Sequence, residues 1–252
     1  HLLEGAARHA QPAAPVVVQE KVGVAALPKS SCQVALVAGH AGGSHRGVER
    51  LGQLRTRGVH LLRVPSLVEM SGKTDEPVMR TYTLSSTPSR PLSIAVTVKA
   101  QADSIGTRWM FDNLKPGMKL RAFGPLGDFS FVRHPGDKYL FISAGSGITP
   151  MMSMTRWMAD CVPETDVTFI SCARRPDDLL FRSELEVLAT QMSGLNLGFI
   201  VEGHEARHGW HGLRGRIDGA KLPLLAPDFM DRTVFCCGPE PFMRGVREML
   251  KS

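Results

Sequence analysis

The sequence predicts a two-domain protein, with an antiparallel β-barrel over residues 1–135 followed by a Rossmann-like parallel-sheet α/β domain over residues 136–252. Two observations predict this order. Between Pro77 and Gly127, short strand patterns follow one another closely and enclose only one short helical stretch, which is typical of a barrel. After His134-Pro135-Gly136, strand and helix patterns alternate, which is typical of a parallel sheet with crossover helices.

The first 74 residues carry weak signals, because they contain no Phe, Tyr, Trp, Ile, Asn or Asp. Strands favour aromatic and β-branched residues, and turns favour Asn and Asp. Short strands are expected at Val16–Val18 and Gln33–Val37. The remainder of residues 1–76 is atypical, and two interpretations stay open: a subdomain with poor local signals, or a frameshift, fusion or sequencing artefact.

From Pro77 onward the patterns sharpen. In the first half, strands are expected at Thr81–Leu84, Leu92–Lys99 and Met118–Phe123, a helix at Arg108–Leu114 and a loop at Gly124–Gly127. In the second half, strands are expected at Lys138–Ser143, Asp166–Ala173, Leu195–Glu202 and Arg232–Cys237, and helices at Pro150–Asp160, Phe181–Gln191 and Pro241–Leu250.

Composition narrows the function classes. The net charge is +6 with a pI of about 9.3, yet the basic residues are scattered, which disfavours nucleic acid as a partner. The five cysteines form neither a disulfide framework, nor a zinc site, nor the spacing of a plant-type [2Fe–2S] cluster. Because the cysteines form no disulfide framework, a reducing, cytoplasmic setting is expected. No apolar run approaches the roughly 18 residues of a membrane span.

Three short segments carry the chemistry. The first is Gly145-Ser-Gly147-Ile-Thr149-Pro150, which follows an apolar strand and opens a helix. Such glycines let backbone N–H groups approach a phosphate, and a helix N-terminus favours its negative charge. Because Pro150 replaces the last glycine of G-x-G-x-x-G, a plain strand-to-helix turn is the alternative at this point.

The second segment is Arg80-Thr81-Tyr82-Thr83-Leu-Ser-Ser86, and the third is Cys237-Gly238-Pro239 at the end of a strand. Strand alternation places Arg80 and Tyr82 on one face, where a guanidinium can bind phosphate and a flat ring can stack. Strand ends line the ligand crevice of an open α/β sheet. Taken alone, each segment also fits an ordinary polar strand or a buried structural cysteine.

In this order and at these separations, the three segments resemble the ferredoxin–NADP reductase superfamily, over about Pro77–Ser252. The similarity is greatest to reductase components of Rieske-type oxygenases that demethylate quaternary ammonium compounds such as glycine betaine, and to hybrid-cluster protein reductases. The resemblance implies a flavin-binding barrel and a nicotinamide-binding α/β domain. It also implies FAD and NADH or NADPH as cofactors, and an iron–sulfur protein or oxygenase component as electron acceptor.

The resemblance also implies roles for individual residues. Arg80 and Ser86 would bind phosphate, Thr81 would lie in the same flavin segment, Tyr82 would stack on the flavin, and Thr83 would bond near its N5. Gly145, Gly147 and Thr149 would seat the dinucleotide, and Cys237, Gly238 and Pro239 would abut the nicotinamide. Thr83 and Cys237 are therefore the candidate catalytic residues.

Two further segments resemble the family more weakly. Val98 and Lys99, followed by Gly106 and Thr107 at a helix start, match the next flavin segment, although a simple helix cap explains the latter pair equally well. Arg174 ends the strand that normally meets the adenosine ribose. Since Arg favours NADPH and the nearby Asp177 favours NADH, the choice between them stays open.

The chain departs from the family in two ways. It lacks a Pro-Gly-Gln-Phe-like element ahead of Arg80, where Val64-Pro65-Ser66-Leu67 stands instead, and its 252 residues do not include the cysteines of the [2Fe–2S] domain that such proteins usually carry. A degenerate or truncated nucleotide-binding or docking subunit without turnover is therefore the alternative function. A second alternative is His204-Glu205-Ala-Arg-His208, which matches the zinc-protease pattern H-E-x-x-H. It follows a strand and lies among glycines, where a polar loop is expected rather than the helix that zinc chemistry needs.

Overall fold

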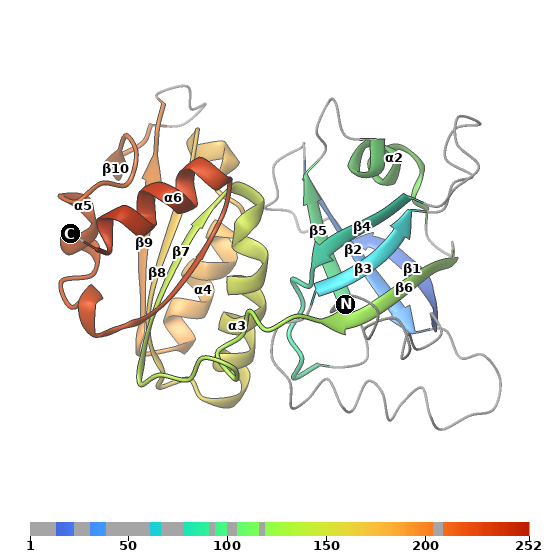
Figure 1. Ribbon diagram of the computed structural model, residues 1–252, viewed down its shortest axis with the longest axis horizontal. Helices are drawn as coiled ribbons and strands as arrows, with labels where there is room; N and C mark the ends of the chain where they lie inside the picture. The colour runs from blue at the N-terminus through green and yellow to red at the C-terminus, as the bar shows by residue number, and fades with distance from the viewer. Residues whose placement is uncertain are drawn as a thin grey trace, which may run out of the picture.

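The computed structural model describes residues 14–22, 31–38, 61–66, 78–90, 94–99, 105–115, 119–203 and 209–251. These residues form an antiparallel sheet and a parallel sheet that lie side by side (Figure 1). Helix α3 (Ile148–Cys161) covers the side of the parallel sheet that faces the antiparallel one. The predicted domain boundary near residue 135 falls between these sheets and stays a prediction.

The antiparallel sheet has six described strands in the order β4-β3-β6-β1-β2-β5. Their bounds are β1 Ala14–Val22, β2 Ser31–Ala38, β3 Leu61–Ser66, β4 Val78–Thr83, β5 Ile94–Lys99 and β6 Lys119–Leu126. A bridge between Leu84 and Val96 joins the two edge strands, so the sheet curls back on itself. The strands expected at Val16–Val18 and Gln33–Val37 are present, whereas β3 was not expected.

The predicted loop at Gly124–Gly127 is wrong, because β6 continues to Leu126. Phe123 pairs with Arg63 and Leu126 with Leu61, so β6 uses one more residue than β3 between the two pairs. This is a β-bulge, and it holds the Gly-Pro dipeptide that suggested a loop. Bulges are among the few places where a sheet accepts proline, which is why strand and loop signals coincide here.

Helix α2 (Ile105–Asn113) is longer at its start than the predicted helix at Arg108–Leu114. Gly106 and Thr107 therefore lie in its first turn rather than ahead of it. Met110 and Leu114 are buried one turn apart, whereas Arg108 and Asp112 form an exposed ion pair of 2.9 Å. One face of the helix is thus packed, and the other is exposed.

The parallel sheet has the strand order β10-β9-β8-β7-β11. Its strands are β7 Lys138–Ala144, β8 Asp166–Ala173, β9 Leu195–Val201, β10 Leu213–Arg214 and β11 Thr233–Cys237. Besides α3, its helices are α4 Arg182–Gln191, α5 Lys221–Leu225 and α6 Glu240–Met249. The expected Rossmann-like α/β arrangement is confirmed, with two short additions, β10 and α5.

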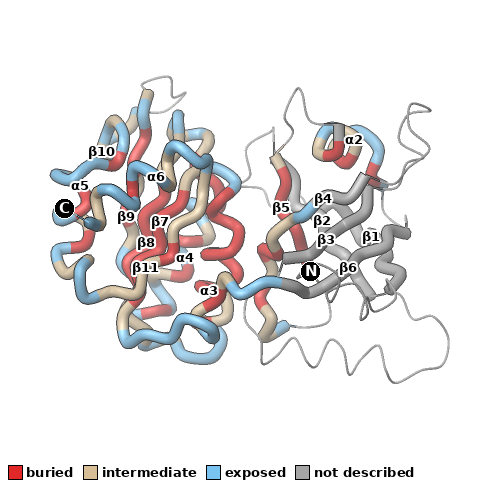
Figure 2. The backbone as a smooth tube through the Cα atoms, in the orientation of Figure 1, coloured by how far each residue is buried: buried red, intermediate tan, exposed pale blue. Residues whose placement is uncertain are grey.

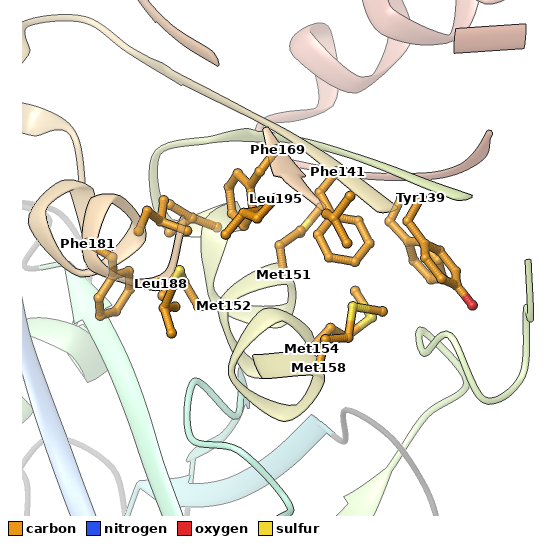
Figure 3. Close-up of a cluster of buried hydrophobic side chains, with 14 of the residues drawn as sticks. Tyr139, Phe141, Met151, Met152, Met154, Met158, Phe169, Phe181, Leu188 and Leu195 are labelled. Carbon is orange, nitrogen blue, oxygen red and sulfur yellow. The ribbon is translucent and has the colours of Figure 1, made fainter. Parts of the chain in front are cut away.

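Alternate residues of β7, an inner strand of this sheet, pack into two separate cores. Tyr139 and Phe141 of β7 pack with α3 and α4, whereas Leu140 and Ile142 pack with α5 and α6. Figure 2 shows the central strands as buried, and Figure 3 shows the first of these cores, where four methionines of α3 meet the aromatic rings. Burial on both faces explains why β7 reads as a continuous apolar run.

A network of charges ties the starts of the strands together. The Arg232 guanidinium donates to Asp166 at 2.7 Å, to Asp228 at 2.7 Å and to the Tyr139 carbonyl at 3.2 Å. Hydrogen bonds from Arg232 and Lys138 hold the pKa of the Asp228 carboxyl below its usual range. This edge of the sheet is therefore a structural anchor, opposite the edge where the glycine turn lies.

No helix within the described ranges is both long and apolar enough to cross a bilayer.

Replacement of Phe141 by Ala should lower the free energy of unfolding by about 3–5 kcal/mol, because the ring is fully buried and meets Phe169 and Phe235 edge to face. Urea denaturation followed by circular dichroism measures this. Val187→Ala, on the exposed face of α4, is the control and should change stability by less than about 0.5 kcal/mol. Equal effects in the two variants would contradict the core assignment.

Candidate active site at the junction of the two sheets

The carboxyl ends of β7 and β11 define the first half of the site. From β7 the chain moves through α3 to β8 on one side, and it later returns to β11 on the other side of β7. Such a change of direction leaves a crevice beyond the strand ends, where open α/β sheets bind ligands. The Gly145–Gly147 turn follows β7, and Cys237-Gly238-Pro239 follows β11, so both predicted segments meet at this crevice.

The glycine turn is a single 3₁₀ turn that leads directly into α3. Gly145 has φ +56°, a left-handed conformation that glycine adopts without steric cost, and a Cβ built there would meet no atom within 4 Å. Gly145 and Ser146 are exposed, so the backbone at the start of the helix is open to a ligand. The buried Thr149 donates its hydroxyl to the Ser146 carbonyl at 3.1 Å and stiffens this turn.

Gly147 brings the two predicted segments into direct contact. A Cβ built on Gly147 would lie 2.3 Å from the Cys237 carbonyl oxygen and 2.6 Å from the Gly238 nitrogen. Real Cβ atoms do not approach backbone so closely, so only glycine fits. The dinucleotide turn and the Cys-Gly-Pro segment therefore form one backbone cluster.

The Cys237 thiol lies half-buried at this cluster. Burial raises its pKa, and the hydrogen bond with the Gly238 backbone only partly opposes this effect. Burial also raises the pKa of the neighbouring Cys236 thiol to about 11 and that of the Cys172 thiol to about 12. A raised pKa disfavours the thiolate, so Cys237 is suited to packing beside a ring rather than to nucleophilic attack.

The Arg80–Ser86 segment supplies the second half of the site. Arg80–Thr83 ends β4, with Thr83 opposite Leu61 of β3, and Tyr82 and Thr83 are half-buried. The Ser86 hydroxyl accepts from the Ala95 N–H at 2.9 Å and keeps its own proton for another acceptor. The Ser86 hydroxyl is thus anchored on β5.

Ser85 is a residue that the sequence analysis missed. It is fully buried, donates its hydroxyl to the Ala95 carbonyl at 3.2 Å and accepts from the Thr97 hydroxyl at 2.9 Å. These bonds fix the main chain directly after Thr83 and Leu84.

The two halves adjoin each other. Cα atoms of β5 come within 8 Å of those of the Gly145–Gly147 turn. The Ser153 hydroxyl of α3 donates to the Ser86 carbonyl at 2.5 Å, and Arg156 of α3 donates to the Ser85 carbonyl. The structure therefore brings the Arg80–Ser86, Gly145–Thr149 and Cys237–Pro239 segments to one junction.

The remaining predicted site residues lie nearer its edges. Lys99 ends β5 and faces Asp178 at 3.9 Å, beyond the end of β8. Val98 and Gly106 are buried, and Thr107 is half-buried in the first turn of α2. Arg174 is exposed at the end of β8, and its carbonyl accepts from the Gly203 N–H at 2.8 Å. Its neighbourhood holds both charges, with Arg216 and Glu202 3.3 Å apart, so the choice between NADH and NADPH stays open.

A cavity of about 540 Å³ lies at the other end of the parallel sheet, lined among others by Phe131, Trp157 and Glu164. It also touches Lys138 and Asp166, where β7 and β8 begin, so it is separate from the junction. His204–His208, the zinc-protease alternative, lies outside the described residues. Across the residues whose placement is described, no three His, Cys, Asp or Glu side chains gather to hold a metal ion.

Three residues of α3 also lie at the junction and were not expected from the sequence, namely Ser153, Arg156 and Asp160. Their spacing along the helix is the one sequence pattern that could have indicated them. They occupy positions i, i+3 and i+7 of a predicted helix that is otherwise rich in methionine, and this spacing places polar groups on one helix face. The pattern marks a polar face, but it does not name the partner segment.

Comparison with known proteins finds relatives among oxidoreductases. Residues 141–248 match the oxidoreductase NAD-binding domain family. The chain is 56% identical over 174 residues, 69% of its length, to the stachydrine N-demethylase reductase subunit of Rhizobium meliloti, and this covers 49% of that relative. It is 44% identical over 176 residues, 70% of its length and 48% of the relative, to a glycine betaine monooxygenase reductase subunit of Pseudomonas aeruginosa. The chain thus spans about half the length of these relatives.

Solved structures show the same fold. The flavohem-like FAD/NAD-binding domain of nitric oxide dioxygenase from Vibrio cholerae superposes with a TM-score of 0.75 over 96% of this chain and 93% of that one, at 22% identity. The cytochrome b5 reductase domain of Ulva prolifera nitrate reductase gives 0.74 over the same shares, at 18% identity. Both matches cover the two sheets together.

Replacement of Gly147 by Ala should weaken dinucleotide binding at least tenfold and lower the melting temperature, because the new methyl group would displace the backbone at Cys237. Isothermal titration with NADH and a thermal melt measure the two effects. Gly245→Ala is the matched control, since a Cβ at this helical glycine meets no atom within 4 Å. The control should gain about 0.5–1 kcal/mol of stability and bind normally. Normal NADH binding by Gly147→Ala would contradict the site.

Proposed function

We propose that this chain, a member of the ferredoxin–NADP reductase superfamily, is an NAD(P)H-dependent flavin oxidoreductase that delivers electrons to an iron–sulfur protein or oxygenase component. The observation that carries the proposal is the junction of the three segments. A dinucleotide turn, a half-buried Cys-Gly-Pro segment and the hydroxyl-bearing end of β4 come together where the two sheets meet.

The donor set of the N-terminal half suits a flavin. An arginine at position 80, the Ser86 hydroxyl and the start of α2 would supply the cationic, O–H and N–H donors that a pyrophosphate prefers. Tyr82 offers a ring for stacking. The curled antiparallel sheet is, in this proposal, the flavin-binding barrel over residues 1–135, and FAD is its cofactor. When bound, the flavin accepts two electrons as hydride from the nicotinamide and releases them singly.

The residues of the chain bind and align. The backbone at Gly145–Gly147 and the N-terminus of α3 hold the dinucleotide pyrophosphate, and Thr149 keeps that turn rigid. Cys237, Gly238 and Pro239 form the wall against which the nicotinamide lies. The Thr83 hydroxyl would hydrogen-bond the flavin near N5 and so tune the electronics of the ring. No acid–base pair is required, because alignment of the two rings is the main task of the protein.

The proposed partner follows from the relatives. Those named above are reductase subunits of a stachydrine N-demethylase and a glycine betaine monooxygenase. We therefore expect this chain to serve an oxygenase of the same kind. A non-catalytic docking subunit is the competing function, and no described feature favours it, since the three segments retain their predicted residues at the junction.

The visible absorbance spectrum of the purified protein tests the proposal most directly. The protein, alone or after addition of FAD, should show a flavin band that bleaches on anaerobic addition of NADH or NADPH. Comparison of the two nucleotides also reveals which is preferred. A colourless protein that neither takes up FAD nor oxidises either nucleotide would refute the proposal and favour the docking subunit.

Thr83→Ala and Cys237→Ala should each slow flavin bleaching by roughly tenfold, about 1.4 kcal/mol, since each removes one alignment contact. Stopped-flow absorbance measures the rate. Thr83→Ser keeps the hydroxyl and should restore most of it. Thr190→Ala and Cys161→Ala, both at exposed positions, are the matched controls. If all five variants bleached at the wild-type rate, neither Thr83 nor Cys237 would have its proposed role.

A further inference from the structure

We propose that Arg156 is a positioning residue that sets the distance between the flavin side and the nicotinamide side of the junction. This inference rests on the proposed function above. It assigns a second role to α3. The helix begins at the dinucleotide turn, and its side chains also hydrogen-bond the main chain that follows β4. Arg156 acts through Ser85 and does not itself touch the reacting atoms.

The guanidinium of Arg156 is held on three sides. It donates to the Ser85 carbonyl from one nitrogen, and from the other two to Glu184 of α4 at 2.6 and 2.7 Å. It also lies over the Phe181 ring, 5.1 Å from the centroid. Its side chain is only 13% exposed. A bidentate pair with so little exposure fixes the orientation of the guanidinium, as a lysine could not.

The platform beneath Arg156 is unusual. Phe181 is fully buried and has φ +56°, the only left-handed non-glycine residue among those described. A bulky residue in that conformation costs energy and persists only where its surroundings hold it. The turn that precedes α4 thus places the ring and Glu184 together, which gives Arg156 one available position.

Two neighbours on the same face of α3 repeat the contact. Ser153 donates to the Ser86 carbonyl at 2.5 Å, and Asp160 accepts from Arg90 at 2.6 Å and from Ser89. The three α3 residues are spaced i, i+3 and i+7, so one helix face follows the segment 85–90 along its length. Arg156 is the central contact and the one fixed by a bidentate ion pair, whereas the Arg90–Asp160 pair is exposed on its arginine side and contributes less.

The hydrogen bonds from α3 to Ser85 and Ser86 lie between the proposed flavin side and nicotinamide side of the junction. Ser85 and Ser86 come directly after Thr83 and Leu84, and α3 begins directly after Gly147. A helix is stiff along its axis, so a shift at Arg156 moves the end of β4 relative to the glycine turn. Reacting atoms need a separation of about 3–3.5 Å, and an error of about 1 Å costs on the order of 100-fold in rate. The contact is therefore placed to control rate rather than affinity.

Single-turnover reduction measures this effect. Wild type, Arg156→Gln and Arg156→Lys are loaded with FAD and mixed anaerobically with the nucleotide that wild type prefers, and the limiting rate of bleaching is recorded. Arg156→Gln should lower this rate at least tenfold, and Arg156→Lys should lower it nearly as much. The nucleotide Kd should stay within twofold, FAD content should be unchanged, and the long-wavelength charge-transfer absorbance of the stacked rings should weaken.

Controls separate positioning from stability and from the proposed function. Arg182→Lys, in an exposed pair with Glu186 on α4, should behave as wild type. Ser153→Ala is a milder change on the same face and should lower the limiting rate about threefold, which keeps the test decisive if Arg156 variants fail to fold. An unchanged limiting rate in the folded variants, or a loss that merely follows FAD content, would overturn the inference. Failure of wild type to bleach would instead overturn the proposed function.

Discussion

The contact between Gly147 and the peptide that joins Cys237 to Gly238 is the constraint on which the candidate site depends. It joins a turn near the middle of the chain to a strand end about ninety residues later. The two backbones lie so close that no side chain fits between them, so the first residue must be glycine. The crevice at the strand ends, the open start of α3 and the half-buried thiol of Cys237 all follow from it. Any side chain at Gly147 would separate these parts.

Helix α3 then connects this backbone cluster with the antiparallel sheet. Its methionine-rich face packs into the core below β7, and its polar face meets the carbonyls of Ser85 and Ser86. The apolar contacts place the helix firmly against one sheet, and the polar contacts place the other sheet against the helix. Stability and alignment are thus carried by opposite faces of the same element.

Local sequence signals were sufficient for much of the fold and for the local structure of the three segments proposed as the site. The apolar run of β7, the glycines after it and the periodicity of α3 are short-range patterns, and each predicted its element. Other features depend on partners far along the chain. The bulge in β6 resembled a loop in the sequence, because a Gly-Pro dipeptide occurs both in loops and in bulges. The carbonyl that Arg156 binds, that of Ser85, lies 71 residues away along the chain. No spacing rule links such residues, so the hydrogen bond between Arg156 and Ser85 could be found only in the three-dimensional structure.

The hydrogen bonds from α3 to Ser85 and Ser86 have a consequence for the exchange of domains between such proteins. Arg156 and Ser153 bind main-chain carbonyl oxygens, which every amino acid provides, whereas recognition of side chains would demand particular residues at 85 and 86. These two contacts of the parallel-sheet half therefore depend on the backbone path after β4 and not on the identity of residues 85 and 86. Exchange of whole halves between relatives that share this backbone path would therefore preserve these two hydrogen bonds.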